Sequence, residues 1–167
     1  MAISKTKKKE ILDKAKGIAS DSPSIVFVNF KGIKVSDTSN MRKELRKLGV
    51  KFNVFKKTLL SKALSEHKIE GVMPELEGEI AVAYQAEKAG DILAPAREVY
   101  SFVKKFKDSL SIVGGVFEGK YIGKEDMLSI ATIPGRQVLI GQFVNLINSP
   151  IQGLVISLDK IAEKKTN

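Results

Sequence analysis

The sequence is poor in the residues on which most catalytic and metal sites depend: its 167 residues include no cysteine, no tryptophan and one histidine. The absence of cysteine excludes disulfides, thiolate metal sites and cysteine nucleophiles. The single histidine, His67, leaves a histidine-rich metal site or a Ser-His-Asp triad without its parts, and its polar surroundings are typical of a solvated helix end. We therefore expect a protein that is not an enzyme and that holds neither metal nor cofactor.

Long apolar runs are also scarce. The amino terminus is rich in lysine and no apolar segment follows it, which is not the pattern of a secretory signal. No apolar run approaches the roughly 18 residues that are needed to cross a bilayer. These absences predict a cytoplasmic protein with no membrane partner.

Positive charge is abundant and is concentrated in the first part of the chain. Lys and Arg number 28 against 19 Asp and Glu, a formal net charge of +9. Residues 1–68 hold 17 Lys and Arg against 6 Asp and Glu, residues 69–131 hold 7 against 11, and residues 132–167 hold 4 against 2. This surplus favours a polyanionic partner, with nucleic acid ahead of an anionic membrane surface. A merely soluble basic domain is the alternative, but so uneven a distribution is hard to explain by solubility.

The hydrophobic pattern predicts an α/β domain over residues 1–133. β-branched and aromatic residues on both faces of residues 24–30 indicate a central strand, and Ser36 and Gly49 are natural boundaries for the next helix. Further strands are expected at 51–55, 79–84, 111–117 and 120–122, with helices over 5–20, after Phe55 and from Pro95 to Phe106. This order favours an α/β (α+β) sandwich of ferredoxin-like type, in which helices cover a mainly antiparallel sheet.

The sharpest local signal is Lys56-Lys57-Thr58, at a predicted junction between strand and helix. A helix amino terminus carries about half a positive charge, so each lysine there is unfavourable by about 0.3–1 kcal/mol. A bound phosphate reverses that interaction and accepts hydrogen bonds from the free N–H groups. We interpret the three residues as a phosphate clamp, and the alternative is a lysine pair in water at the end of a strand.

A basic stripe on the helix expected to close at Gly49 is a second candidate. Only Glu44 is interleaved with its cations, so ion pairs at i, i+4 do not explain them. Alone the stripe could equally be a solvated face, but beside the junction and Lys31-Gly32 it favours a shared RNA surface, since glycine lets backbone approach a phosphate. The stripe consists of Arg42, Lys43, Arg46 and Lys47, and the predicted RNA-binding set is completed by Lys7, Lys8 and Lys62.

One apparent nucleotide-binding motif is discounted. The segment from Gly114 to Lys120 matches the spacing G-x-x-x-x-G-K of a phosphate-binding loop. However, Tyr121 stands where a Ser or Thr hydroxyl should reach magnesium, and the segment is predicted to run strand-turn-strand with no helix at the lysine. An enzyme that uses this segment is therefore the weakest of the functional hypotheses.

Pro134-Gly135 separates a helical extension, residues 134–167, from the domain. One helix is expected before Pro150, which can occupy the first position of a final helix. Five apolar residues at helical spacing on that final helix have to be buried, either on another protein or back on the same domain. They are Ile151, Leu154, Val155, Leu158 and Ile161.

An ordered series of short segments along nearly the whole chain closely resembles bacterial large-subunit ribosomal protein number ten, the stalk-base family. Lys57 departs from the family pattern, in which asparagine usually follows the first lysine of the junction. The tail also looks shorter than in members with an extra helical segment. The matching segments are Val28-Asn29-Phe30-Lys31-Gly32, residues 41–50, residues 54–60, Ile130-Ala131-Thr132-Ile133-Pro134 and residues 150–154.

The resemblance implies that residues 1–133 bind the GTPase-associated region of large-subunit ribosomal RNA, beside ribosomal protein eleven. It also implies that residues 134–167 carry dimers of the acidic stalk protein seven/twelve, which recruit translational GTPases, and the short tail favours two dimers. An RNA-binding translational regulator or ribosome-assembly factor of the same family, without stalk binding, is the alternative.

Overall fold

The computed structural model describes residues 5–67, 69–76, 78–85, 91–106 and 109–166. The chain divides into two compact units, Met1–Ile133 and Pro134–Asn167, which we call the amino-terminal domain and the tail. The elements of the domain are α1 (Lys5–Asp21), β1 (Ser24–Asn29), α2 (Val35–Lys47), β2 (Val50–Phe55), α3 (Lys57–Ser65), β3 (Ile80–Gln85), α4 (Ala94–Lys105), β4 (Ser111–Phe117), β5 (Lys120–Ile122) and α5 (Lys124–Ala131).

The sheet confirms the predicted ferredoxin-like, antiparallel architecture. Its five strands lie in the order β2-β3-β1-β4-β5, and every neighbouring pair is antiparallel. Because β1 and β2 both run antiparallel to β3 between them, they are parallel to each other, and α2 connects them across that gap. The same holds for β3 and β4 on either side of β1, with α4 as the connection, so the domain contains two interlocked split βαβ units.

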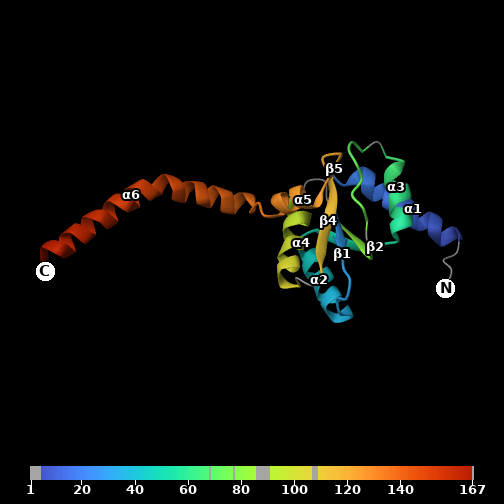
Figure 1. Ribbon diagram of the computed structural model, residues 1–167, viewed down its shortest axis with the longest axis horizontal. Coiled ribbons are helices and arrows are strands. Elements are labelled where there is room, and N and C mark those ends of the chain that lie inside the picture. Colours follow the sequence, from blue (N-terminus) through green and yellow to red (C-terminus); the bar gives the residue numbers. More distant parts are fainter. Residues whose placement is uncertain (1–4, 68, 77, 86–90, 107–108, 167) are drawn as a thin grey trace. The chain divides into compact units, whose positions relative to one another are not determined.

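Helices cover both faces of the sheet (Figure 1). Successive residues of the central strand β1 alternate between two cores, as its apolar pattern predicts. Val26 and Val28 face the core shared with α2, α4 and α5, whereas Ile25 and Phe27 face the core shared with α1 and α3. α1 packs along α3, and Lys16 on α1 forms an ion pair with Glu66 at the end of α3.

The predicted start of α2 is wrong, whereas its predicted end is confirmed. The residue that precedes the helix is Lys34, whose extended backbone (φ −65, ψ 145) has the geometry of an N-cap, and no side chain caps the helix there. Ser36 lies inside the first turn instead, because the helix begins at Val35. Gly49 follows the helix with φ +76, a conformation that favours glycine.

Close packing explains the glycines of the apparent phosphate-binding loop. A Cβ on Gly115 would overlap the carbonyl oxygen of Ile25 and the Met127 methyl, and a Cβ on Gly114 would come within 2.7 Å of the Ile122 carbonyl oxygen. β4 and β5 form a hairpin through a turn at 118–119, where both residues have positive φ. The segment is strand-turn-strand as predicted, and no helix begins at its lysine.

The tail is a single helix, α6 (Arg136–Thr166), so the predicted division into two helices at Pro150 is wrong. Proline removes one hydrogen bond, to the carbonyl of Leu146, and normally bends a helix at that point. The ribbon of α6 is accordingly continuous and curved (Figure 1). One lost bond among those of a 31-residue helix bends the helix without ending it.

The expectation that no segment is long enough to cross a membrane also needs correction. Residues 136–163 form one helix that is long and apolar enough by length and composition alone. The sequence pattern concealed it because Gln, Asn, Ser and Gly interrupt the apolar residues, although residues 137–158 carry no charged side chain. Length and composition are weak evidence of a span, because other apolar helices pass the same test.

Candidate nucleic-acid interface and exposed tail helix

The lysine junction lies at a helix amino terminus, as the sequence predicts. Lys56 is the N-cap of α3, and its carbonyl accepts hydrogen bonds from the N–H groups of Leu59 and Leu60 at 2.9 and 3.0 Å. No side chain caps the helix, and its first turn contains no acidic residue. Lys56, Lys57 and Thr58 are all exposed. The first N–H groups of the helix lack partners within it, so this terminus is suited to an anion.

The carboxyl ends of β1 and β2 meet at a hollow of about 590 Å³, which we call the edge hollow. Phe30 lines it from the end of β1, and Lys56 and Lys57 line it from the end of β2. Since Lys31 and Gly32 directly follow Phe30, the fold brings two separate predicted RNA-binding segments to one edge of the sheet. Gly32 is exposed with φ +88 and has open space where a Cβ would lie.

α1 contributes to the same edge. Ile11 lines the edge hollow, and Lys7 and Lys8 precede it by four and three residues, which places them on the same side of the helix. Both lysines are exposed. We call the predicted cations of these three segments, Lys7, Lys8, Lys31, Lys56 and Lys57, the basic edge; Lys56 and Lys57 line the hollow, and the other three lie within four residues of Ile11 or Phe30, which also line it.

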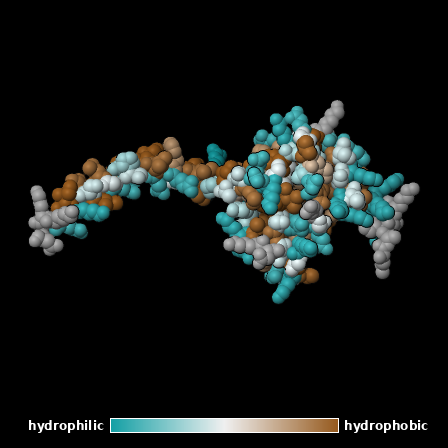
Figure 2. Space-filling model, in the orientation of Figure 1, coloured by the Kyte–Doolittle hydropathy of each residue, from teal (hydrophilic) through white to brown (hydrophobic). Residues whose placement is uncertain are grey.

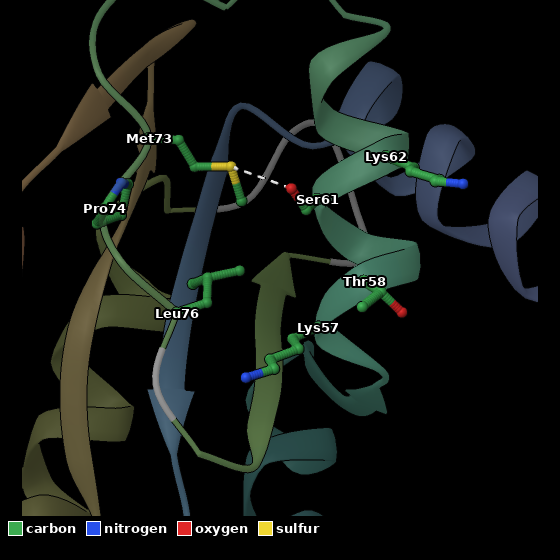
Figure 3. Close-up of a pocket in the computed structure, with 7 residues that line it drawn as sticks. All are labelled: Lys57, Thr58, Ser61, Lys62, Met73, Pro74 and Leu76. Carbon is green, nitrogen blue, oxygen red and sulfur yellow. Dashed lines mark hydrogen bonds between the residues drawn. The ribbon is translucent and has the colours of Figure 1, made fainter.

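A second hollow, of about 510 Å³, lies between α3 and the segment that precedes β3 (Figure 3). Met73, Pro74 and Leu76 form its apolar wall, and Ser61 donates a hydrogen bond to the sulfur of Met73 at 3.9 Å. The side chain of Lys57 extends toward this segment. Thr58 and Lys62 also line the hollow, but their polar ends point away from the segment (Figure 3). Lys57 thus borders both hollows.

The basic stripe of α2 is separate from the basic edge. α2 packs on the face of the sheet opposite to α3. The strand β2 runs from near Lys47 to Lys56, and a strand of this size is about 17–20 Å long. Lys43, Arg46 and Lys47 are exposed, but Arg42 is half-buried. The structure therefore gives two basic areas where the sequence suggested one shared surface.

The tail helix exposes apolar side chains along its length (Figure 2). Leu154 is 63% exposed and Leu158 57% exposed, and the other three predicted partner-binding residues are exposed to a similar degree. The first half of the helix is equally apolar, with Leu139 and Phe143 at 42% and 63%. At 100° per residue these side chains fall on the same side of α6 as Leu154. Because the tail consists of one helix, it has no second element of its own to cover them.

Comparison with known proteins identifies the family. The model of the family described as Ribosomal protein L10 matches residues 3–106. The chain belongs to the Ribosomal protein L10 family. It is 33% identical over 159 residues to the large ribosomal subunit protein uL10 of Lactobacillus johnsonii, covering 95% of each chain. It is 30% identical over 158 residues to the protein of the same name from Bacillus licheniformis, covering 95% of this chain and 93% of the relative.

Membership of the Ribosomal protein L10 family confirms the prediction of a non-catalytic ribosomal protein in the cytoplasm. Among the described residues, no group of His, Asp and Glu is placed to hold a metal ion.

Sequence reasoning missed part of both surfaces of this L10-family chain. It did not include Ile11, Phe30, Val54 and Glu79 in the candidate site, because residues from four segments come together only in the folded sheet. It also confined the predicted partner-binding face to residues 151–161. The apolar spacing of residues 139–147 was visible in the sequence and could have extended that face.

Proposed function

We propose that this protein is the base of the stalk of the large ribosomal subunit. The amino-terminal domain binds the GTPase-associated region of large-subunit ribosomal RNA, beside ribosomal protein eleven. The tail carries dimers of the acidic stalk protein seven/twelve, which recruit translational GTPases. The convergence of α1, the β1 end and the two lysines of the β2 end on one hollow supports the first part, and the uncovered apolar side of α6 supports the second.

The RNA-binding part of the proposal rests on the basic edge. Two lysines at an uncapped helix amino terminus are unfavourable in the free protein and become favourable on a phosphate. Lys56 and Lys57 form no ion pair among the described residues, so they are available to a polyanion.

The salt dependence of RNA binding tests this part. If about six phosphates are neutralised, the log–log slope of affinity against salt is about −4 to −5. Replacing Lys56 and Lys57 by alanine should flatten that slope by about one to two units. The matched control removes two adjacent lysines from the carboxyl end of α4, Lys104 and Lys105, and should leave the slope unchanged. Equal slopes for the two double variants would contradict the assignment of the basic edge.

The stalk-binding part rests on the apolar side of α6. Full burial of five large apolar side chains contributes roughly 7–15 kcal/mol before the costs of association. Pro150 divides the exposed apolar residues into two groups, represented by Leu139 with Phe143 and by Leu154 with Leu158. We assign one stalk dimer to each group, hence two dimers to the tail.

Aspartate substitutions on the two sides of α6 test the tail. Leu154→Asp with Leu158→Asp should remove one dimer from the complex and leave RNA affinity unchanged. Asn145→Asp with Gln152→Asp adds the same two charges on the polar side and should leave both dimers bound. Retention of both dimers by the leucine double variant would refute the assignment. A wild-type chain that binds RNA but no stalk protein would instead be a translational regulator or assembly factor of the same family.

A further inference from the structure

The edge hollow has an apolar interior beside its cations. Phe30 is half-buried and Val54 is 47% exposed, so both present apolar surface to solvent beside Lys56 and Lys57. Phosphate contacts alone need no such surface, because they are made by charges and N–H groups. An apolar surface with an aromatic ring, flanked by lysines, is the arrangement on which proteins stack unpaired bases.

One carboxylate, Glu79, also lines the edge hollow. It is exposed and forms no ion pair among the described residues. A carboxylate repels the RNA backbone but accepts a hydrogen bond from the amino group of a base, as Glu and Asp do from N4 of cytosine. Glu79 is therefore placed to select a base that carries an amino group, while the neighbouring lysines attract the RNA backbone.

We propose that the edge hollow takes one unstacked RNA base that bears an exocyclic amino group. Phe30 and Val54 contact the base, Glu79 accepts a hydrogen bond from its amino group, and Lys56 and Lys57 neutralise the phosphates beside it. This inference rests on the proposed RNA-binding function and adds the mode of recognition. The target is consequently a loop or bulge, because a base paired within a duplex cannot enter the hollow.

Two homopolymers of equal length isolate the role of Glu79. Oligocytidylate and oligouridylate carry the same phosphates, but cytosine has an amino donor where uracil has a carbonyl acceptor. The wild-type protein should bind oligocytidylate about fivefold more tightly. Glu79→Gln should reduce this preference, because the amide can also donate a hydrogen bond to the uracil carbonyl, whereas the loss of the repulsive charge affects both oligomers alike. Equal affinities of the wild-type protein for both oligomers, or parallel changes in the variant, would overturn the role of Glu79.

A steric block tests the hollow itself. Val54→Trp fills it from its wall, whereas Val72→Trp places the same side chain at a valine that is 90% exposed and does not line it. The first variant should bind oligocytidylate about 5- to 150-fold more weakly, as expected for loss of one stacked base, and the second should bind as the wild type does. Thermal unfolding of both variants shows whether each is folded.

The outcomes separate this inference from the proposed function. If Val54→Trp binds normally while the alanine pair at Lys56 and Lys57 flattens the salt slope, the base site is wrong and RNA anchoring stands. If the wild-type protein binds neither oligomer nor the GTPase-associated RNA, the proposed function itself fails.

Discussion

Arg42 on α2 lies over the ring of Phe52 on β2, with its guanidinium carbon 5.9 Å from the ring centroid. The other three cations of the stripe are exposed, whereas Arg42 is half-buried. Its Nε is buried and has no hydrogen-bond partner among the described residues. Arg42 is therefore held in the fold by its contact with the Phe52 ring and by the packing of its half-buried side chain, a role that its neighbours on α2 do not share.

Substitution of Arg42 should destabilise the domain more than substitution of an exposed cation on the same helix. Arg42→Ala should lower the free energy of unfolding by about 0.5–2 kcal/mol, because the ring contact and the packed stem are lost. Arg46→Ala removes the same charge from an exposed position and should change the free energy of unfolding by less than about 0.5 kcal/mol. Urea denaturation of both variants measures the difference, and equal losses would show that the ring contact adds nothing.

Glycine at 115 should be required for the sheet. Gly115→Ala should destabilise the domain by about 1–3 kcal/mol or more, because its Cβ would overlap β1 backbone and the Met127 side chain. Gly123→Ala is the matched control, since nothing lies within 4 Å of a Cβ at that position. Thermal unfolding compares the two. A Gly115→Ala protein as stable as the control would contradict the described packing of β4.

Local patterns predicted most of the domain, and contacts distant in sequence account for the rest. The two-faced apolar run of β1 identified the central strand, and the lysine pair identified the start of α3. The sequence did not place Phe30 beside Lys56, because that proximity depends on strand order. Nor did it reveal that Pro150 lies within one helix, since proline is compatible both with a helix start and with a bend.

Alkaline pH should destabilise the domain through two tyrosines. Burial raises the pKa of Tyr84 and of Tyr121 above the ordinary value of 10.0, and a hydrogen bond donated by Asn53 offsets part of the effect at Tyr84. A raised pKa means that the folded state holds these protons more tightly than the unfolded state. Their contribution is therefore complete below about pH 10 and is lost as the pH rises through the folded-state values.

Denaturation at increasing pH measures this loss. The free energy of unfolding of the wild-type protein should fall above about pH 10. The double variant Tyr84→Phe with Tyr121→Phe should show a shallower fall, because neither position can ionise. Identical pH dependences would contradict a contribution from these two phenols.

Removal of the proline from α6 should stabilise the helix. Pro150→Ala restores the N–H group that the Leu146 carbonyl lacks and should favour the helix by up to about 3 kcal/mol. Gly141→Ala, also inside α6, should contribute about 1 kcal/mol or less. Amide hydrogen exchange around residues 146–154 should slow more in the proline variant. Faster exchange there would mean that proline is not the weak point of the helix.

The proposed function requires one chain to hold RNA through its basic edge and stalk protein through its tail at the same time. Native mass spectrometry of the chain mixed with GTPase-associated RNA and the acidic stalk protein tests it directly. The spectrum should show a complex of one chain, one RNA and two stalk dimers, which loses one dimer in the variant Leu154→Asp with Leu158→Asp. A complex in which RNA and stalk protein exclude each other, or in which that variant keeps every dimer, would contradict it.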